Sequence, residues 1–265
     1  MMEVNCGTAP TVDENLAVDE SLARNASATG RRQLRFWWGG PPAVVMGFSE
    51  RAEQVANLDA CAKYGVKLLK RCTGGGTVLQ TAGVLNYSLI TPAPDHIDLK
   101  AGYRQGTDIV CAILSAIGIT GAPRGTSDVA VGDRKISGNA QARRWKALLV
   151  HGTLLVDFDF DLAEKVLLHP LREPEYRQGR SHRDFLVSLR ALGVPADRAL
   201  IERLAIGAAR QVDGPESIPR GGEHTSGAAQ QAQFNCFSWR WRQRRLAEER
   251  AKPMQKQIEE GFNET

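Results

Sequence analysis

Three consecutive glycines, Gly74, Gly75 and Gly76, are the feature that most constrains the fold of this chain. They follow an apolar segment at 66–70 and precede another at 84–90, so they form a loop between two predicted strands. Glycine adopts positive φ without steric cost, and successive backbone N–H groups in such a loop can converge on an anion. The segment lacks the GxxxxGK[ST] pattern of a P-loop, and a tight connection without a ligand is the alternative interpretation.

Arg71 stands three positions before Gly74 and sharpens the prediction of an anion site. A guanidinium beside a glycine loop suits bidentate binding of a carboxylate or a phosphate. The alternative is that Arg71 forms a surface ion pair. We include the flanking residues Thr73, Thr77 and Val78 in the candidate site, together with the three glycines.

A second group of candidate residues lies in a predicted hairpin with a Gly-Asp turn at 132–133. Lys135 stands at the start of the second strand, and small polar residues follow it, among them Ser137 and Gly138. Most lysines at strand ends are solvated. Small neighbours leave room for a ligand, however, and an ammonium fixed in a cleft would stabilise charge that develops on a phosphate and an attacked carboxylate.

The third group is His151-Gly152-Thr153 within an otherwise apolar strand. A single histidine in such a strand is usually a hydrogen-bonded core residue, and only the neighbouring motifs favour a binding role. Trp38 follows another strand and could form the wall of a hydrophobic pocket, with core packing as the equal alternative.

Helices and strands are predicted in clusters without a regular βαβ alternation, which favours an α+β fold with a mixed or antiparallel sheet flanked by helices. A capping box of Thr11 and Glu14 opens the first helix. The predicted helices cover 13–25, 52–64, 99–117, 161–168, 183–192 and 196–209. The predicted strands cover 34–38, 43–46, 66–70, 84–90, 129–131, 134–140 and 147–156.

Composition excludes several classes of protein. The longest apolar stretch, 109–119, is about half of the ~20 residues that a membrane span needs. Acidic residues precede the first base, Arg24, which does not fit a secretory or transit peptide and makes the cytoplasm the expected location. Five cysteines at irregular spacing without a CxxC pair indicate reduced thiols and no zinc site. A net charge of +4 is too small to indicate nucleic-acid binding.

The chain is expected to contain one catalytic domain at 1–211, followed by two shorter segments. Residues 212–233 are rich in Gly, Ser, Pro and Gln and are predicted to be a flexible linker. Residues 234–265 are basic and predicted to be a helical tail that is exposed to solvent. The alternative is that this tail binds RNA or an acidic partner.

Taken together, the three groups resemble the lipoate–protein ligase family, a relative of the biotin ligases and octanoyl transferases. Arg71 with the glycines resembles the family's arginine and triple-glycine loop, and 133–138 resembles its catalytic-lysine segment. Residues 151–155 resemble its third motif, and 15–20 its opening helix. The resemblance implies a biotin/lipoate ligase-like catalytic domain, lipoate and ATP with Mg²⁺ as substrates, a lipoyl-AMP intermediate and a lipoyl-carrier protein as acceptor.

The resemblance also implies roles for individual residues. Lys135 would contact the α-phosphate and the carboxylate, and Trp38 would line the apolar tunnel for the acyl tail. Thr153 would close the site, and Asp128 would serve the nucleotide, the metal or the incoming amine. The remaining residues expected to bind the adenylate are Arg71, Thr73, Gly74, Gly75, Gly76, Thr77, Val78, Ser137, Gly138, His151 and Gly152.

Departures from the family pattern favour one of the activities that occur among these relatives. One branch of transferases carries a nucleophilic cysteine just before the hairpin. The corresponding segment of this chain, 121–128, contains no cysteine. We therefore predict an ATP-dependent ligase. The alternatives are an octanoyl or lipoyl transferase that works without ATP, through Cys72 or Cys111, and a non-catalytic lipoyl-adenylate binder. The accessory domain of larger ligases is not recognisable after residue 211, so we expect either that a separate polypeptide supplies it or that this branch works without it.

Overall fold

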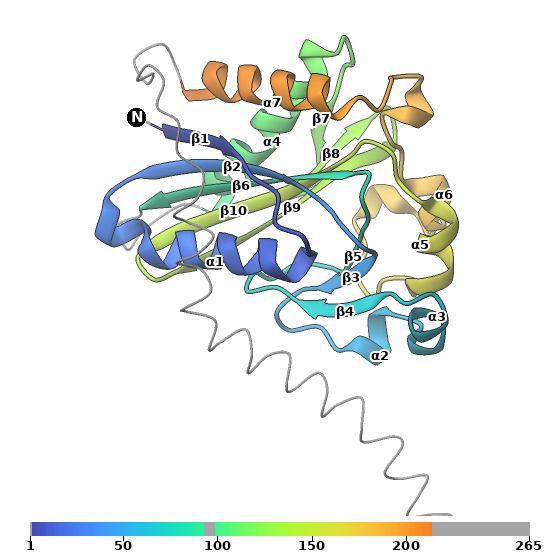
Figure 1. Ribbon diagram of the computed structural model, residues 1–265. Coiled ribbons are helices and arrows are strands. Elements are labelled where there is room, and N and C mark those ends of the chain that lie inside the picture. The colour runs from blue at the N-terminus through green and yellow to red at the C-terminus, as the bar shows by residue number, and fades with distance from the viewer. Residues whose placement is uncertain (1, 93–98, 214–265) are drawn as a thin grey trace, which may run out of the picture.

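The computed structural model describes residues 2–92 and 99–213 of the 265-residue chain, in an α+β fold (Figure 1). Two sheets form its frame. The large sheet has the strand order β1-β2-β6-β10-β9-β8-β7, and the small one β4-β3-β5. The strands are β1 (Met2–Cys6), β2 (Arg32–Trp38), β3 (Ala43–Met46), β4 (Lys67–Lys70), β5 (Val78–Gln80), β6 (Val84–Pro92), β7 (Ala122–Arg124), β8 (Asp128–Val131), β9 (Arg134–Arg144) and β10 (Ala147–Leu155).

Both sheets are mixed. In the large sheet β1 and β2 are parallel and all other neighbours are antiparallel. In the small sheet β3 is parallel to β4 and antiparallel to β5. The predicted mixed sheet flanked by helices is therefore confirmed. The short strands β1, β5 and β7 were not predicted, because three to five residues carry too little periodicity.

Helices cover both faces of the large sheet. Figure 1 shows α1 on one face, with α4 and α7 on the other. On the α4 side a large apolar cluster includes Phe36, Tyr87, Ile113 and Val150. The helices are α1 (Val12–Thr29), α2 (Ala52–Val55), α3 (Leu58–Lys63), α4 (Leu99–Ala116), α5 (Phe160–Val166), α6 (His182–Phe185) and α7 (Arg198–Asp213), with 3₁₀ turns η1 (Glu175–Arg177) and η2 (Arg190–Leu192).

Two predicted helices are broken by backbone pairing. The prediction at 52–64 splits into α2 and α3, because Ala56 is extended and bridges to Leu167, while the Asn57 side chain caps α3. The prediction at 183–192 keeps only α6 and η2, because Leu186 is extended and bridges to Lys135. Tertiary hydrogen bonds override helical propensity at both places.

The capping box at the start of α1 is confirmed, since the Thr11 and Glu14 side chains each accept from the other residue's backbone N–H. The expected linker at 212–233 begins inside α7, which runs to Asp213. The rest of it and the tail at 234–265 lie outside the described residues. None of the described helices is long and apolar enough to cross a membrane.

Candidate active site

Arg71 fixes the conformation of the glycine loop through hydrogen bonds. Its guanidinium donates to the carbonyl oxygens of Gly74 at 2.6 Å, Gly76 at 2.7 Å and Val45 at 3.2 Å, and its Nε donates to Thr73 Oγ1 at 2.9 Å. Burial lowers its pKa to about 10, with Glu50 opposing the shift, so the side chain stays cationic at neutral pH. Arg71 therefore organises the loop and presents a buried positive charge beneath it.

The path of the loop depends on two glycines. Gly75 has φ +84°, which L side chains rarely adopt. Gly47, in the turn after β3, lies against the loop so closely that a Cβ there would stand 1.9 Å from the Gly75 carbonyl oxygen. Glu50 ties the same turn to the loop, because its carboxylate accepts from Gly47 N at 2.9 Å and from Thr77 Oγ1 at 2.6 Å.

His151 on β10 supports the loop from the large sheet. Its Nε2 lies 2.7 Å from Thr73 Oγ1, which already accepts from Arg71. Burial, reinforced by the Arg71 charge, lowers the pKa of His151 to about 3. The imidazole is thus neutral, and it shares a hydrogen bond with the Thr73 hydroxyl.

Lys135 and Asp128 form an ion pair where β8 meets β9. Lys135 Nζ is 2.8 Å from Asp128 Oδ1, with side-chain exposures of 24% and 8%. Tyr176 donates to Asp128 Oδ2 at 2.9 Å, and burial together with the Asp128 charge raises the pKa of Tyr176. Gly138 leaves space for the ammonium, since a Cβ there would stand 2.7 Å from Nζ. The ammonium is fixed by one carboxylate and is partly open.

Asn139 links the hairpin to the neighbouring strands. Its Oδ1 accepts from the Tyr87 hydroxyl, and its Nδ2 donates to the Ser127 carbonyl oxygen at 2.6 Å. Gly152 makes this contact possible, because a Cβ at that position would lie 2.0 Å from Asn139 Oδ1. The glycine of the third motif therefore serves close packing between β10 and β9.

Two adjoining pockets meet at this place. The inner pocket, of about 150 Å³, has the apolar walls Leu16, Trp37 and Val45. The outer pocket, of about 370 Å³, extends toward Phe158, Leu167 and Phe185. Both are lined by Gly76, Thr77, Val78, Ser127, Asp128, Lys135, Gly138 and Thr153. Lys135 thus stands where the pockets join, opposite the glycine loop.

The three predicted motifs come together here, although they are far apart in the sequence. Besides the shared residues, Arg71, Gly75, His151 and Gly152 line the inner pocket, and Ser137 lines the outer one. Thr73 and Gly74 line neither pocket and instead accept hydrogen bonds from Arg71, so their expected contact with the ligand is corrected to a supporting role. Pocket-lining residues that the sequence analysis missed include Leu16, Val45, Asn86, Tyr87, Tyr103, Ser127 and Ala140.

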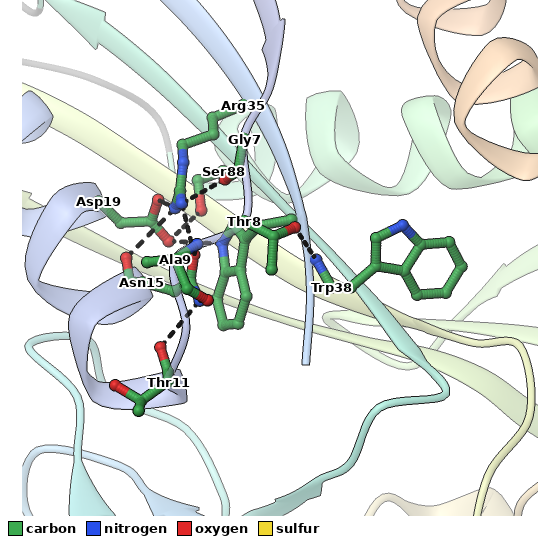
Figure 2. Close-up of polar contacts among 10 residues, drawn as sticks. Gly7, Thr8, Ala9, Thr11, Asn15, Asp19, Arg35, Trp38 and Ser88 are labelled. Carbon is green, nitrogen blue, oxygen red and sulfur yellow. Dashed lines mark hydrogen bonds and ion pairs between the residues drawn. The ribbon is translucent and has the colours of Figure 1, made fainter. Parts of the chain in front are cut away.

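The expectation for Trp38 was wrong by one residue. Its indole packs in the core on the α4 side and donates to Glu202 Oε1 at 2.6 Å, whereas Trp37 lines the inner pocket. Successive side chains of β2 point to opposite faces of the sheet, so a shift of one position reverses the face. Figure 2 shows the Trp38 indole pointing away from the polar groups around Asp19.

Behind Trp37 lies a buried polar cluster built around Asp19 and Arg35 (Figure 2). Arg35 Nη1 donates to Asp19 Oδ1 at 2.7 Å, and the two side chains are only 5% and 2% exposed. Asp19 Oδ2 accepts from Ser88 Oγ at 2.6 Å and from Trp37 Nε1 at 3.0 Å. The carboxylate is thereby satisfied on both oxygens, and it fixes the indole that forms the pocket wall.

The described residues offer no nucleophilic thiol in either pocket. Cys72 is buried against α1, and Cys111 lies on α4, where burial and Asp108 raise its pKa. A thiol in such surroundings is a poor nucleophile at neutral pH. Residues 2–92 and 99–213 also contain no group of three or more His, Cys, Asp or Glu side chains that could hold a metal ion by themselves.

Several known proteins with similar sequences are named as lipoate–protein ligases, and one, of Carboxydothermus hydrogenoformans, is named as the octanoyltransferase LipM and is 29% identical over 198 residues. A putative lipoate-protein ligase A of Aeropyrum pernix is 30% identical over 161 residues, covering 61% of this chain and 60% of the relative. Lipoate-protein ligase A subunit 1 of Thermoplasma acidophilum is 32% identical over 166 residues, covering 59% and 63%. The chain thus matches less than two thirds of the length of these relatives.

A solved structure agrees with this likeness. The bi-partite lipoate protein ligase of Thermoplasma acidophilum, described with its E2 lipoyl domain, superposes with a TM-score of 0.75 at 25% identity, covering 90% of this chain and 93% of that one. Residues 11–205, which hold all three motifs, match the family model of the lipoyl protein ligase A/B catalytic domain. The chain belongs to the lipoyl protein ligase A/B catalytic-domain family.

Proposed function

We propose that the protein is a lipoate–protein ligase. It activates lipoate with ATP to lipoyl-AMP and transfers the lipoyl group to a lysine of a lipoyl-carrier protein. The observation that carries this proposal is the position of Lys135, held by Asp128 at the junction of two pockets and facing the glycine loop.

The two pockets suit the two substrates of adenylation. The inner pocket, with Leu16, Trp37 and Val45 as apolar walls, accommodates the acyl tail. The outer pocket accommodates the nucleotide. Two buried polar atoms on its lining residues, Ser137 Oγ and Arg177 Nη2, have no hydrogen-bond partner within residues 2–92 and 99–213, and buried polar groups are normally satisfied.

Lys135 acts by positioning and electrostatics in both steps. In the first step a lipoate carboxylate oxygen attacks the α-phosphorus, and pyrophosphate leaves. In the second, the carrier's amine attacks the acyl carbonyl, loses a proton and displaces AMP. Negative charge develops near the α-phosphate in both steps, and a pre-oriented ammonium stabilises it without reorganisation.

The carboxylates at the site fit a Mg²⁺ ion that arrives with ATP. Asp128 and Glu50 line the outer pocket. One or two carboxylates are the usual protein contribution where phosphates supply other oxygen ligands of Mg²⁺. Asp128 already binds Lys135 and Tyr176, so its first role is to hold the ammonium in place.

The acceptor and a second polypeptide are further parts of the proposal. The solved Thermoplasma ligase is bi-partite and is described with an E2 lipoyl domain, which supports a lipoyl domain as acceptor and a separate accessory polypeptide here. Residues 1–211 would then be the catalytic domain, with 212–233 as linker and 234–265 as tail.

The proposal is tested by pyrophosphate release. We expect the purified protein to release pyrophosphate from ATP only when lipoate is present. A transferase would release none, would modify its carrier from an acyl donor without ATP, and would carry an acyl thioester on Cys72 or Cys111. Tight binding of lipoyl-AMP without turnover would identify a non-catalytic binder.

A further inference from the structure

The turn between β9 and β10 has a strained backbone conformation. Trp145 and Lys146, its two central residues, have φ of 58° and 53°. This combination belongs to type I′ turns, which favour Asn-Gly, because other L residues are strained in the left-handed region. Bulky residues in such a turn indicate a role beyond closing the hairpin.

Trp145 fixes the turn on the body of the protein. The Arg24 guanidinium lies 4.2 Å from the centre of its ring, and that of Arg144 lies 5.1 Å away. Trp145 also packs against the apolar cluster that contains Cys72 of the glycine loop and Ala23 of α1. The hairpin end is therefore rigid.

The surface of this hairpin end is basic. Arg143, Arg144 and Lys146 are exposed, and the segment 141–147 contains no acidic residue. The Arg144 guanidinium lies 5.6 Å from the ring centre of Phe48, a phenylalanine that is 50% exposed. We call residues 143–146 together with Phe48 the basic tip.

The basic tip adjoins the glycine loop. Phe48 N donates to the Thr73 carbonyl oxygen at 2.8 Å, and its neighbour Gly47 lies against Gly75. A protein seated on the basic tip would thus border the glycine loop, where the adenylate is proposed to lie.

We propose that the basic tip is the docking surface for the acceptor protein and that it recognises an acidic surface around the acceptor lysine. The inference rests on the proposed function, since it assumes a protein acceptor. Adjacent exposed bases steer an acidic partner and fix its orientation, while the exposed aromatic ring adds apolar contact. The contacts of Trp145 with Arg24 and with the apolar cluster of Cys72 and Ala23 fix the backbone of the turn, which reduces the entropic cost of association.

The test compares charge reversal at the basic tip with the same reversal elsewhere. Variant one carries Arg143→Glu and Lys146→Glu, and the control carries Lys63→Glu and Arg203→Glu, two exposed bases on α3 and α7. The probe is an immobilised apo E2 lipoyl domain, titrated with each protein at low and high salt. We expect the Kd of the tip variant to rise about tenfold at low salt and the control to match wild type.

A second variant separates docking from folding. Lys146→Gly places the residue best suited to φ 53° in the turn and removes one charge. Its thermal midpoint should equal or exceed that of wild type, while its Kd for the lipoyl domain rises. An unchanged Kd in both tip variants overturns the proposal. So does wild-type protein that binds a short DNA duplex through the tip and does not bind the lipoyl domain.

Pyrophosphate release without carrier is measured on the same proteins and should be equal in all of them. Tip-dependent binding of the lipoyl domain together with absent pyrophosphate release in wild type would contradict the ligase proposal and leave the docking surface standing. Normal pyrophosphate release together with lipoyl-domain binding that does not depend on the basic tip would contradict the docking surface and leave the ligase proposal standing.

Discussion

Lys135 is the residue on which the proposed chemistry depends. Lys135→Ala removes the ammonium that faces both pockets, so lipoate-dependent pyrophosphate release should fall by about 10²–10³-fold, as when one pre-oriented donor to a developing charge is lost. Stopped assays of pyrophosphate would measure this. Lys135→Arg keeps the charge but changes its geometry, and should recover only part of the rate.

The far-UV circular dichroism and the thermal midpoint of Lys135→Ala serve as controls for folding. Lys135 is partly exposed, so the fold should persist. Full activity of Lys135→Ala would exclude the role given to this lysine.

Asp19 is expected to act through Trp37. Asp19→Asn leaves the buried Arg35 guanidinium without its counter-charge, which should lower the free energy of unfolding by about 3 kcal/mol. The Trp37 indole loses a charged acceptor, so KM for lipoate should rise more than KM for ATP. Urea unfolding and initial rates measure the two effects.

Asp59→Asn is the matched control, because Asp59 is exposed on α3. It should change the free energy of unfolding by less than about 0.5 kcal/mol. A parallel rise of both KM values in Asp19→Asn would indicate general loosening instead of a displaced pocket wall.

At the scale of elements, the glycine loop has one position at which a side chain is not tolerated. Gly75→Ala introduces a Cβ at φ +84° and within 3.1 Å of Arg71 Nη2, so the loop must move. We expect KM for ATP to rise by about tenfold or more, since the backbone N–H groups lose their alignment. Steady-state kinetics with ATP as the varied substrate would show this.

Gly74→Ala is the control within the same loop. Gly74 has no positive φ, a Cβ there would have nothing within 4 Å, and the residue lines neither pocket. It should leave KM for ATP within about twofold. Equal effects of the two substitutions would contradict the role of the Gly75 conformation.

The sequence predicts helices and strands well where a hydrophobic pattern extends over many residues. It predicts them poorly where hydrogen bonds to distant parts of the chain determine the backbone conformation. The capped helix α1 and the strands around the glycine loop agree with their predictions, because local signals and packing coincide there. The predicted helices at 52–64 and 183–192 failed at Ala56 and Leu186, where bridges to the distant residues Leu167 and Lys135 hold the backbone extended. No local window contains those partners.

The candidate site shows the same division. Motif segments identified Lys135 and most of the glycine loop, because these residues act through local geometry. Trp37 was missed, since alternation along a strand separates two faces without saying which one carries the pocket. Tyr87, whose hydroxyl donates to Asn139 on a strand 52 residues further along the chain, had no signal in the sequence.

At the scale of the whole molecule, His151 should make stability depend on pH. Its pKa in the native state is about 3, below the ordinary value of 6.5. Between these values the unfolded state binds a proton that the native state does not, so stability is lost as pH falls below about 6.5. At pH 5 this contribution is about 2 kcal/mol.

Urea unfolding of His151→Gln and wild type at pH 7.5 and pH 5 isolates the effect. The variant should lose less stability than wild type between the two pH values, because glutamine does not titrate. His169→Gln, at an exposed position, should follow wild type. Identical pH dependence in all three proteins would show that His151 is not buried as a neutral ring.

The whole molecule brings Arg71, Lys135 and His151 from three separate segments to one place, and the central claim is that this place joins lipoate to a protein lysine at the expense of ATP. The most direct measurement is the intact mass of an apo E2 lipoyl domain after incubation with the purified protein, lipoate and ATP, with any accessory polypeptide supplied in parallel. We expect a single lipoyl addition that requires ATP and is lost with Lys135→Ala. Addition from an acyl donor without ATP, or undiminished addition by Lys135→Ala, would contradict it.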